Sequence, residues 1–368
     1  MNKVVVVTGG TVGIGRATAR AFAEKGWSVG IIARDEDRLR ATEAELRELG
    51  VAALGISADV ADATAIDAAA ARFEAELGPI DTWVNNAMAT VVSPARDISP
   101  EEFARVTDVT YLGQVHGTLA ALRHMTPRRR GTVIQISSGL GIRSAPLQSA
   151  YCGAKAAVRG FTDSLRSELI HDRLGAIQLT VVYLPAVNTP QFDWARNHTG
   201  QRQTAPDPVF DPRLCAAAVL FAATHRRRDI WVGRSTLQMA VGQRLVPGVL
   251  DRVAAKMWDG QLQGDEAPTA PEGNLFAPVP GDPGIDGRFG DRTKATQSEF
   301  WTSRNRDAAL AGVVGLGVLG VATLAAPAMM LAGLLMRFPP PRPRVMPAVQ
   351  VAAGLMEGAL LRRQRRRA

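Results

Sequence analysis

The sequence contains few residues that could bind a metal or build a disulfide framework. Only two cysteines, Cys152 and Cys215, occur among 368 residues, which excludes a disulfide-based scaffold and fits a reducing compartment. The five histidines stand at positions 116, 124, 171, 198 and 225, without the short spacing of metal ligands. We therefore predict no metal site.

Net charge is nearly absent from most of the chain, although the total is +8. Residues 337–368 contain eight arginines and one glutamate, so they carry +7 and leave +1 for the first 336 residues. A domain that binds nucleic acid normally carries its own basic face. We therefore predict no nucleic-acid partner and assign the basic character to a tail.

From residue 3 to about 232, apolar runs rich in β-branched residues alternate with helical patterns. Continuous apolar strands separated by helices are typical of a parallel sheet covered on both faces. We predict an α/β, Rossmann-like, doubly wound fold that binds ligands at the carboxyl ends of its strands. The predicted strands are Lys3–Thr8, Ser28–Ala33, Ala52–Ser57, Ile80–Asn85, Thr132–Ser137, Gln178–Tyr183 and Asp229–Val232, and the predicted helices are Ala17–Lys25, Asp37–Leu49, Ala63–Leu77, Pro100–Met125 and Ala150–His171.

Three segments of different character follow this domain, which we place at residues 1–258. Residues 259–307 are rich in Gly and Pro and predict a linker or irregular extension, although several aromatic residues there could dock on the domain. Residues 308–336 contain no charged side chain, and about 20 helical residues would cross a hydrocarbon core. We predict a membrane-inserted apolar helix at 308–336, followed by the basic tail at 337–368.

The tail leaves the topology of this segment open. Cationic segments prefer the cytoplasmic side, yet a single crossing would carry the tail outward. Pro327 also interrupts the apolar run. The segment could re-enter or lie at the interface with the tail on anionic lipid, or Met346–Leu361 could make a second, shallow crossing. Because the N-terminus lacks a signal-peptide pattern, we expect a membrane-associated protein with its catalytic domain on the cytoplasmic side.

The first predicted strand leads into a glycine-rich turn, TGGTVGIG, at residues 8–15. Glycines at 9, 13 and 15 would let the backbone approach a pyrophosphate, and the next helix would direct N–H groups and a positive dipole at it. A Walker loop is excluded, because it requires Lys and then Ser or Thr where Arg16 and Ala17 stand. The turn therefore predicts a dinucleotide site.

The end of the second strand indicates which dinucleotide is preferred. A site selective for NAD usually has an acidic residue there for the ribose 2′-hydroxyl, whereas an arginine suits a 2′-phosphate. Ala33 holds the expected acid position, Arg34 follows it, and Arg16 could add a second positive contact. A solvated arginine is the alternative interpretation. We predict NADP(H) in preference to NAD(H).

Tyr151 and Lys155 lie four residues apart in SAYCGAK, thirteen residues after Ser138. This spacing places both side chains on one helical face, one turn apart. A free phenol has a pKa of about 10, and a nearby positive charge favours its ionised form. Proton exchange with a substrate oxygen then becomes feasible, with the serine hydroxyl holding that oxygen.

Together these motifs resemble the short-chain dehydrogenase/reductase family over about residues 3–240. Within the family, the sequence is similar to an NADP-preferring bacterial subgroup with a C-terminal membrane-associated extension. The residues that carry the resemblance are TGGTVGIG at 8–15, Asp59-Val60, NNA at 85–87, Ser138, YCGAK at 151–155 and PAVNTP at 185–190.

The resemblance implies a role for each site residue. Ser138 would orient the substrate carbonyl, Tyr151 would exchange its proton, and Lys155 would bind the nicotinamide ribose and lower the tyrosine pKa. Asp59 would touch the adenine and Asn85 would brace the floor of the site, while Val187 and Thr189 would contact the nicotinamide carboxamide. The implied cofactor-binding residues are Thr8, Gly9, Gly13, Ile14, Gly15, Arg34, Asp59, Val60, Asn85, Ala87, Tyr151, Lys155, Val187 and Thr189.

Three positions depart from the family pattern. Met88 replaces the usual glycine after NNA, and the segment that begins at Pro185 is one residue shorter than usual. Thr110 stands where the family has a catalytic asparagine, whose backbone carbonyl is thought to hold a relay water. Because threonine also has that carbonyl, we include Thr110 among the catalytic residues and expect the chemistry to survive.

The sequence therefore predicts an NADP(H)-dependent oxidoreductase that interconverts a carbonyl and a secondary alcohol. Gln191–Phe210 falls where the family forms its substrate lid, and Phe192 and Trp194 suggest an apolar pocket for a lipophilic substrate, unless they only pack the lid. A membrane-tethered NADP-binding scaffold with little catalysis is the alternative function. The family also implies a homodimer or homotetramer, formed through the helices Pro100–Met125 and Ala150–His171.

Overall fold

The computed structural model describes residues 2–264 and 266–295, which belong to one compact unit. The predicted apolar helix at 308–336 and the basic tail lie outside the described residues. Among the residues described, no helix is long and apolar enough to cross a membrane.

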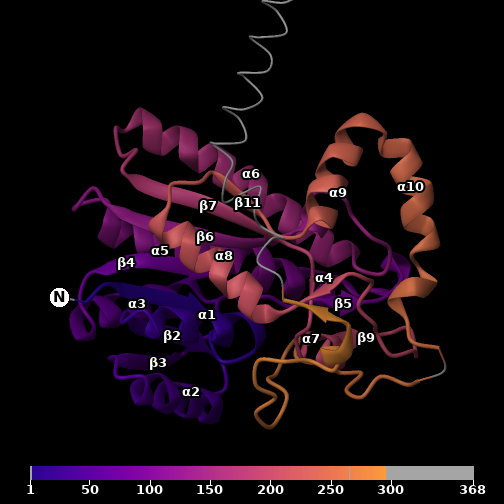
Figure 1. Ribbon diagram of the computed structural model, residues 1–368, viewed down its shortest axis with the longest axis horizontal. Coiled ribbons are helices and arrows are strands. Elements are labelled where there is room, and N and C mark those ends of the chain that lie inside the picture. Colours follow the sequence, from indigo (N-terminus) through magenta and orange to yellow (C-terminus); the bar gives the residue numbers. More distant parts are fainter. Residues whose placement is uncertain (1, 265, 296–368) are drawn as a thin grey trace, which may run out of the picture. The chain divides into compact units, whose positions relative to one another are not determined.

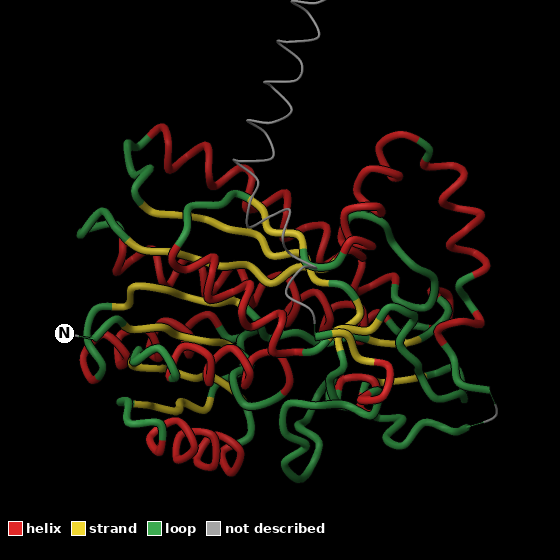
Figure 2. The backbone as a smooth tube through the Cα atoms, viewed as in Figure 1, coloured by secondary structure: helices red, strands yellow, loops and turns green. Residues whose placement is uncertain are grey.

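Seven parallel strands form the central sheet in the order β11-β7-β6-β4-β1-β2-β3, which confirms the predicted Rossmann-like fold (Figures 1 and 2). The chain order reverses next to β1, so the carboxyl ends of β1 and β4 flank the switch point where such sheets bind ligands. These strands are β1 (Val4–Thr8), β2 (Ser28–Ala33), β3 (Ala53–Ser57), β4 (Ile80–Asn85), β6 (Gly131–Ser138), β7 (Ile177–Leu184) and β11 (Asp229–Trp231).

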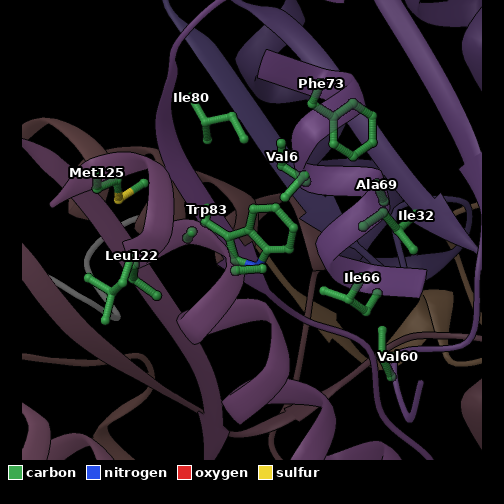
Figure 3. Close-up of a cluster of buried hydrophobic side chains, with 14 of the residues drawn as sticks. Val6, Ile32, Val60, Ile66, Ala69, Phe73, Ile80, Trp83, Leu122 and Met125 are labelled. Atoms are coloured by element: carbon green, nitrogen blue, oxygen red, sulfur yellow. The ribbon is translucent and has the colours of Figure 1, made fainter. Parts of the chain in front are cut away.

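Two hydrophobic clusters cover the two faces of this sheet. Side chains alternate along β1, so that Val4 and Val6 join one cluster and Val5 and Val7 join the other. The first cluster includes side chains of α3 and α5 around Trp83 (Figure 3), and the second includes side chains of α1, α2 and α8. The helices are α1 (Gly13–Ala23), α2 (Glu36–Glu48), α3 (Ala63–Glu76), α4 (Pro100–Thr107), α5 (Gly113–Met125), α6 (Ser149–His171), α7 (Gln191–Trp194), α8 (Pro212–Thr224), α9 (Arg234–Leu245) and α10 (Pro247–Lys256).

The helix predicted over Pro100–Met125 is not continuous. It begins with a capping box, in which Ser99 and Glu102 bond each other's backbone N–H groups. A π-helical turn, η2 (Asp108–Leu112), then separates α4 from α5. Thr110 lies in this turn, and its buried hydroxyl bonds the backbone of the loop after β4. The prediction of one helix was wrong because π turns depend on such tertiary contacts and leave little trace in periodicity.

The described part of the Gly/Pro-rich segment, residues 259–264 and 266–295, packs on the domain through short elements. β12 (Thr293–Lys294) pairs with β10 (Val209–Phe210), which pairs with β8 (Ala186–Val187). Phe289 is buried, whereas Phe276 is 54% exposed, so only one of these two aromatic residues anchors the segment. The remaining short elements are β5 (Val91–Val92), β9 (Arg196–Asn197), η1 (Ala95–Asp97), η3 (Gly139–Gly141), η4 (Asp259–Gln261) and η5 (Gly290–Arg292).

Two helical glycines provide a matched test of packing beneath the site. A Cβ at Gly117 would lie 2.2 Å from Asn85 Oδ1, whereas a Cβ at Gly160 would meet nothing within 4 Å. Alanine favours a helix over glycine, so Gly160→Ala should stabilise the fold by about 0.5–1 kcal/mol. Gly117→Ala should instead destabilise it by about 1–3 kcal/mol, because the core is overpacked. Urea unfolding measures both values, and equal stability of the two variants would contradict this packing.

Candidate active site

The glycine-rich turn connects β1 to α1 and leaves no space for side chains. Gly13 has a φ of +56°, and a Cβ at Gly15 would lie only 1.9 Å from the carbonyl oxygen of Gly9. The Asn86 amide, which follows β4, donates to the carbonyls of Thr8 and Gly9 at 3.0 and 3.2 Å. The turn is thus a tight backbone cradle held by a side chain from the neighbouring strand, and it fits a bound pyrophosphate.

Positive charge gathers beyond the ends of β2 and β3. Arg34 follows β2, while Asp59, two residues beyond β3, forms an ion pair with Arg105 of α4. Burial opposes ionisation of Asp59, but hydrogen bonds from Arg105 and the Ala61 N–H hold the pKa of its carboxyl below the usual value. Asp35 accepts from the Arg38 backbone N–H and pairs with the Arg38 side chain, so its carboxylate caps α2.

Ser138, Tyr151 and Lys155 meet where β6 ends and α6 begins. Ser138 is the last residue of β6, and its hydroxyl lies near enough to the Tyr151 phenol to act on the pKa of that phenol. Lys155 lies one turn further along α6, with its Nζ 5.7 Å from the centre of the Tyr151 ring. That Nζ also donates to the carbonyl of Ile136 on β6 at 2.6 Å. Strand and helix therefore hold the three groups together, as their spacing predicts.

Burial dominates the electrostatics of this triad. It raises the pKa of the Tyr151 phenol well above its usual value, and the nearby Ser138 side chain acts against that rise. Burial also lowers the pKa of Lys155 to about 7. Both shifts disfavour the charged forms. The lowering of the tyrosine pKa by Lys155 stays a prediction.

Asn85 and Thr110 lie below the site rather than in it. The Asn85 side chain is fully buried, and its amide lies within hydrogen-bond distance of the Gln114 carbonyl, Thr118 and Gln135. The Thr110 hydroxyl donates to the Ala89 carbonyl at 2.7 Å and accepts from the Ala89 N–H at 2.9 Å. Because its hydroxyl is used in this way, any part that Thr110 plays in a proton relay must use its backbone carbonyl.

The two predicted lid residues, both in α7, contact different neighbours. Phe192 packs edge-on against Phe289, with ring centres 5.2 Å apart. The Trp194 ring lies 5.8 Å from the Arg38 guanidinium carbon, which places it on the side of the site formed by β2 and α2. Trp194 thus lies near the residues predicted to bind the cofactor 2′-phosphate. Its predicted role in the substrate lid did not indicate this position.

One cavity connects most of these groups. All the predicted site residues except Thr8, Arg16, Asn85 and Thr110 line it. The cavity is also lined by Thr11, Asn86 and Arg38. These residues lie in the loops after β1 and β4 and in α2, close to the strand ends where the sequence predicts ligand binding. Leu140, Met239 and Met257 add an apolar wall, and Asn274, Pro278 and Val279 come from the segment after residue 258. These distant residues carry no local motif, so the sequence offered no signal for them.

This geometry fits a nicotinamide dinucleotide, because the cavity joins a backbone phosphate cradle to a serine–tyrosine–lysine group. A family model described as short chain dehydrogenase matches residues 3–199. The chain belongs to the short-chain dehydrogenase family. Membership implies an oxidoreductase that uses NAD(P)(H) on carbonyl or alcohol groups.

Relatives of this short-chain dehydrogenase include the oxidoreductase YxnA of Bacillus subtilis, 34% identical over 70% of this chain and 72% of the relative. The 3-dehydrosphinganine reductase of Danio rerio is 32% identical over 51% of this chain and 57% of that protein. A solved structure of a metagenomic short-chain oxidoreductase in complex with NADP matches with a TM-score of 0.53 and 27% identity. It covers 62% of this chain and 95% of its own.

Replacement of the phenol tests the triad. Tyr151→Phe should lower turnover by about 10³-fold, because the proton donor is lost, while cofactor affinity should stay within about twofold. Tyr183→Phe is the matched control: Tyr183 is buried where Tyr151 is partly buried, and its ring stacks on Trp231 at 4.3 Å, outside the cavity. Steady-state kinetics with a panel of carbonyl compounds measures turnover, and near-normal activity of Tyr151→Phe would refute the assignment.

Proposed function

We propose that the chain is an NADP(H)-dependent reductase or dehydrogenase that interconverts a carbonyl and a secondary alcohol. The observation that carries the proposal is that Ser138 and Tyr151, with Lys155 one helical turn away, line the same cavity as the glycine-rich turn. The serine and tyrosine can bind one substrate oxygen together, which is what proton exchange at a carbonyl or alcohol requires.

The bound nicotinamide supplies the hydride chemistry, and the protein supplies position and protons. Ser138 and Tyr151 hold the carbonyl oxygen, and the Tyr151 hydroxyl gives its proton to that oxygen in reduction or takes it back in oxidation. Because burial disfavours the phenolate, charge forming on Tyr151 needs support from Lys155 and Ser138. Leu140, Met239 and Met257 add apolar surface to the lining of this cavity.

The preference for NADP(H) is supported by the groups that follow β2. Asp35 is the nearest acid to the strand end, but its carboxylate is engaged by Arg38 and the start of α2, so it does not compete with a phosphate. Arg34 has five N–H donors. Its side chain makes three hydrogen bonds to backbone carbonyls, which leaves one Nη2–H and the Nε–H for a ligand.

Removal of this arginine tests the preference. Arg34→Ala should lower kcat/KM for NADPH by about 10–100-fold, the usual value of a charged hydrogen bond, and change that for NADH by less than about threefold. Arg40→Ala, which removes an exposed arginine of α2, is the control. An equal loss with both cofactors would contradict recognition of the 2′-phosphate by Arg34.

A lipophilic substrate is supported by the apolar residues that line the cavity and by the exposed apolar helices that carry two of them. Met239 lies in α9, and Met257 follows α10 directly. These two helices form a hairpin that projects from the sheet (Figure 1). Its exposed apolar side chains are Leu237, Val241, Leu245, Val246, Val249 and Val253. The name of the Danio rerio relative, 3-dehydrosphinganine reductase, is that of an enzyme for a long-chain ketone.

We further propose that the protein associates with a membrane, with the catalytic domain on the cytoplasmic side. The uncharged stretch 308–336 and the arginines that follow it support this proposal. The exposed apolar face of the α9–α10 hairpin has Arg244, Arg252 and Lys256 along the same helices, a composition suited to an anionic bilayer surface. Assembly as a homodimer or homotetramer stays a prediction.

A ketone series tests the substrate class. With NADPH, KM should fall by about fourfold for each added methylene until the pocket is filled, because each buried CH₂ contributes about 0.8 kcal/mol. Met239→Glu should abolish this trend by placing a charge in the wall. Leu245→Glu is the control, since that side chain is 74% exposed and does not line the cavity. Activity confined to small polar carbonyls would rule out a lipophilic substrate.

A further inference from the structure

Residues 272–288, here called the strap, cross the cavity at the groups that sequence analysis assigned to the cofactor (orange in Figure 1). At the β2 end, Arg34 donates to the carbonyls of Asn274, Leu275 and Phe276 at 2.6, 3.4 and 3.0 Å. Arg105, which also pairs with Asp59, donates from Nε to the Leu275 carbonyl at 3.1 Å. Three consecutive strap carbonyls therefore fix the guanidinium predicted to bind the 2′-phosphate.

A second set of contacts lies at the glycine-rich turn. The Gly13 N–H donates to the Gly284 carbonyl at 3.0 Å. Arg16, three residues further along α1, makes two hydrogen bonds to the Asp282 carboxylate, at 2.7 and 2.8 Å. The strap therefore touches both the phosphate cradle and the arginine predicted to assist it.

The far end of the strap is anchored beside the segment that carries Val187 and Thr189. Gly287 donates from its N–H to the Asn188 carbonyl at 3.2 Å, and Asp286 pairs with Arg213 at 2.7 Å. Phe289, the next residue after the strap, is buried and donates from its N–H to Asn188 Oδ1. β12 then continues the chain into the small sheet. This end is attached more firmly than the middle.

The middle of the strap is held by polar contacts alone, apart from one side chain. Leu275 is fully buried, whereas the side chains from Phe276 to Pro278 and from Pro280 to Pro283 are exposed. Asn274, Pro278 and Val279 line the same cavity as Gly9, Ser138 and Tyr151. The cavity thus continues beneath the strap, which forms its outer wall. Segments with few buried apolar contacts open more readily than the domain around them.

We propose that the strap encloses the cofactor and orients Arg34, so that the cofactor exchanges only when the strap opens. The inference rests on the proposed use of a nicotinamide cofactor. The first and middle parts of the strap contact groups of the adenosine and pyrophosphate half of the groove, and only its anchored far end reaches the segment assigned to the nicotinamide. The strap consequently controls cofactor residence and leaves the substrate end of the cavity to the α9–α10 hairpin.

Two glycines of the strap provide a matched pair of variants. Gly273 and Gly281 both have positive φ, +60° and +84°, so alanine strains the backbone at both. A Cβ at Gly273 would lie 2.4 Å from the Arg196 N and the Trp194 O, whereas a Cβ at Gly281 would meet nothing within 4 Å. Gly273→Ala should therefore displace the strap, and Gly281→Ala should leave it in place.

The deciding measurement is the dissociation rate of the reduced cofactor from the full-length protein. NADPH, and NADH in parallel, is bound, chased with an excess of the oxidised form, and followed by stopped-flow fluorescence. Gly273→Ala should release the cofactor at least about tenfold faster than wild type, because release no longer waits for the strap to open. Gly281→Ala should stay within about twofold of the wild-type rate. Asp282→Asn changes an exposed side chain, so it does not strain the backbone. It should shift the dissociation rate in the same direction as Gly273→Ala.

An unchanged dissociation rate in both Gly273→Ala and Asp282→Asn overturns the proposal. Tighter cofactor binding at an unchanged dissociation rate also overturns it, because the strap would then compete with the cofactor rather than enclose it. Hydrogen–deuterium exchange over residues 272–288 gives a second readout. Saturating cofactor should slow exchange there in wild type, and no slowing would count against enclosure. No step uses a carbonyl substrate, so a lack of turnover would refute the proposed reaction without altering these rates.

Discussion

Parallel pairing of β1, β4 and β6 is the constraint on which the site depends. The register sets Val7 beside Val84 and Asn85 beside Gln135, so that the three strands end at one edge of the sheet. The glycine-rich turn, the Asn86 amide and the Ser138 hydroxyl therefore emerge next to one another, although they are distant in sequence. Trp83 packs in the hydrophobic cluster below this edge (Figure 3). Its indole N–H donates to Asn85 Oδ1, and the Asn85 amide donates to Gln135.

Most of the fold and the centre of the site could be predicted because their signals are local. The predicted strands at Ser28–Ala33 and Ile80–Asn85 agree with β2 and β4 at both ends, since buried parallel strands are continuous apolar runs. Tyr151 and Lys155 share a helical face by spacing alone. Arg34 was recognisable from its position after β2, but its partners were not, because Asn274 is 240 residues away and no pattern encodes that contact. The π turn at Asp108–Leu112 escaped prediction for the same reason.

The triad shows how burial and function oppose each other. A dry cavity strengthens the interactions of the substrate oxygen with Ser138 and Tyr151, but it disfavours charge on both Tyr151 and Lys155. Neither the direction nor the size of these pKa shifts can be read from the four-residue spacing of Tyr151 and Lys155. Both depend on how completely the surrounding chain excludes water. The sequence thus identifies the reacting groups, whereas the three-dimensional packing decides their protonation.

The reciprocal hydrogen bonds between Thr110 and Ala89 have an evolutionary consequence. Met88, which stands where the family usually has glycine, directly precedes the residue whose N–H and carbonyl are both held by that threonine. The two departures from the family pattern therefore meet in one loop. Exchanges at positions 88 and 110 should be epistatic, since each changes the backbone on which the other depends.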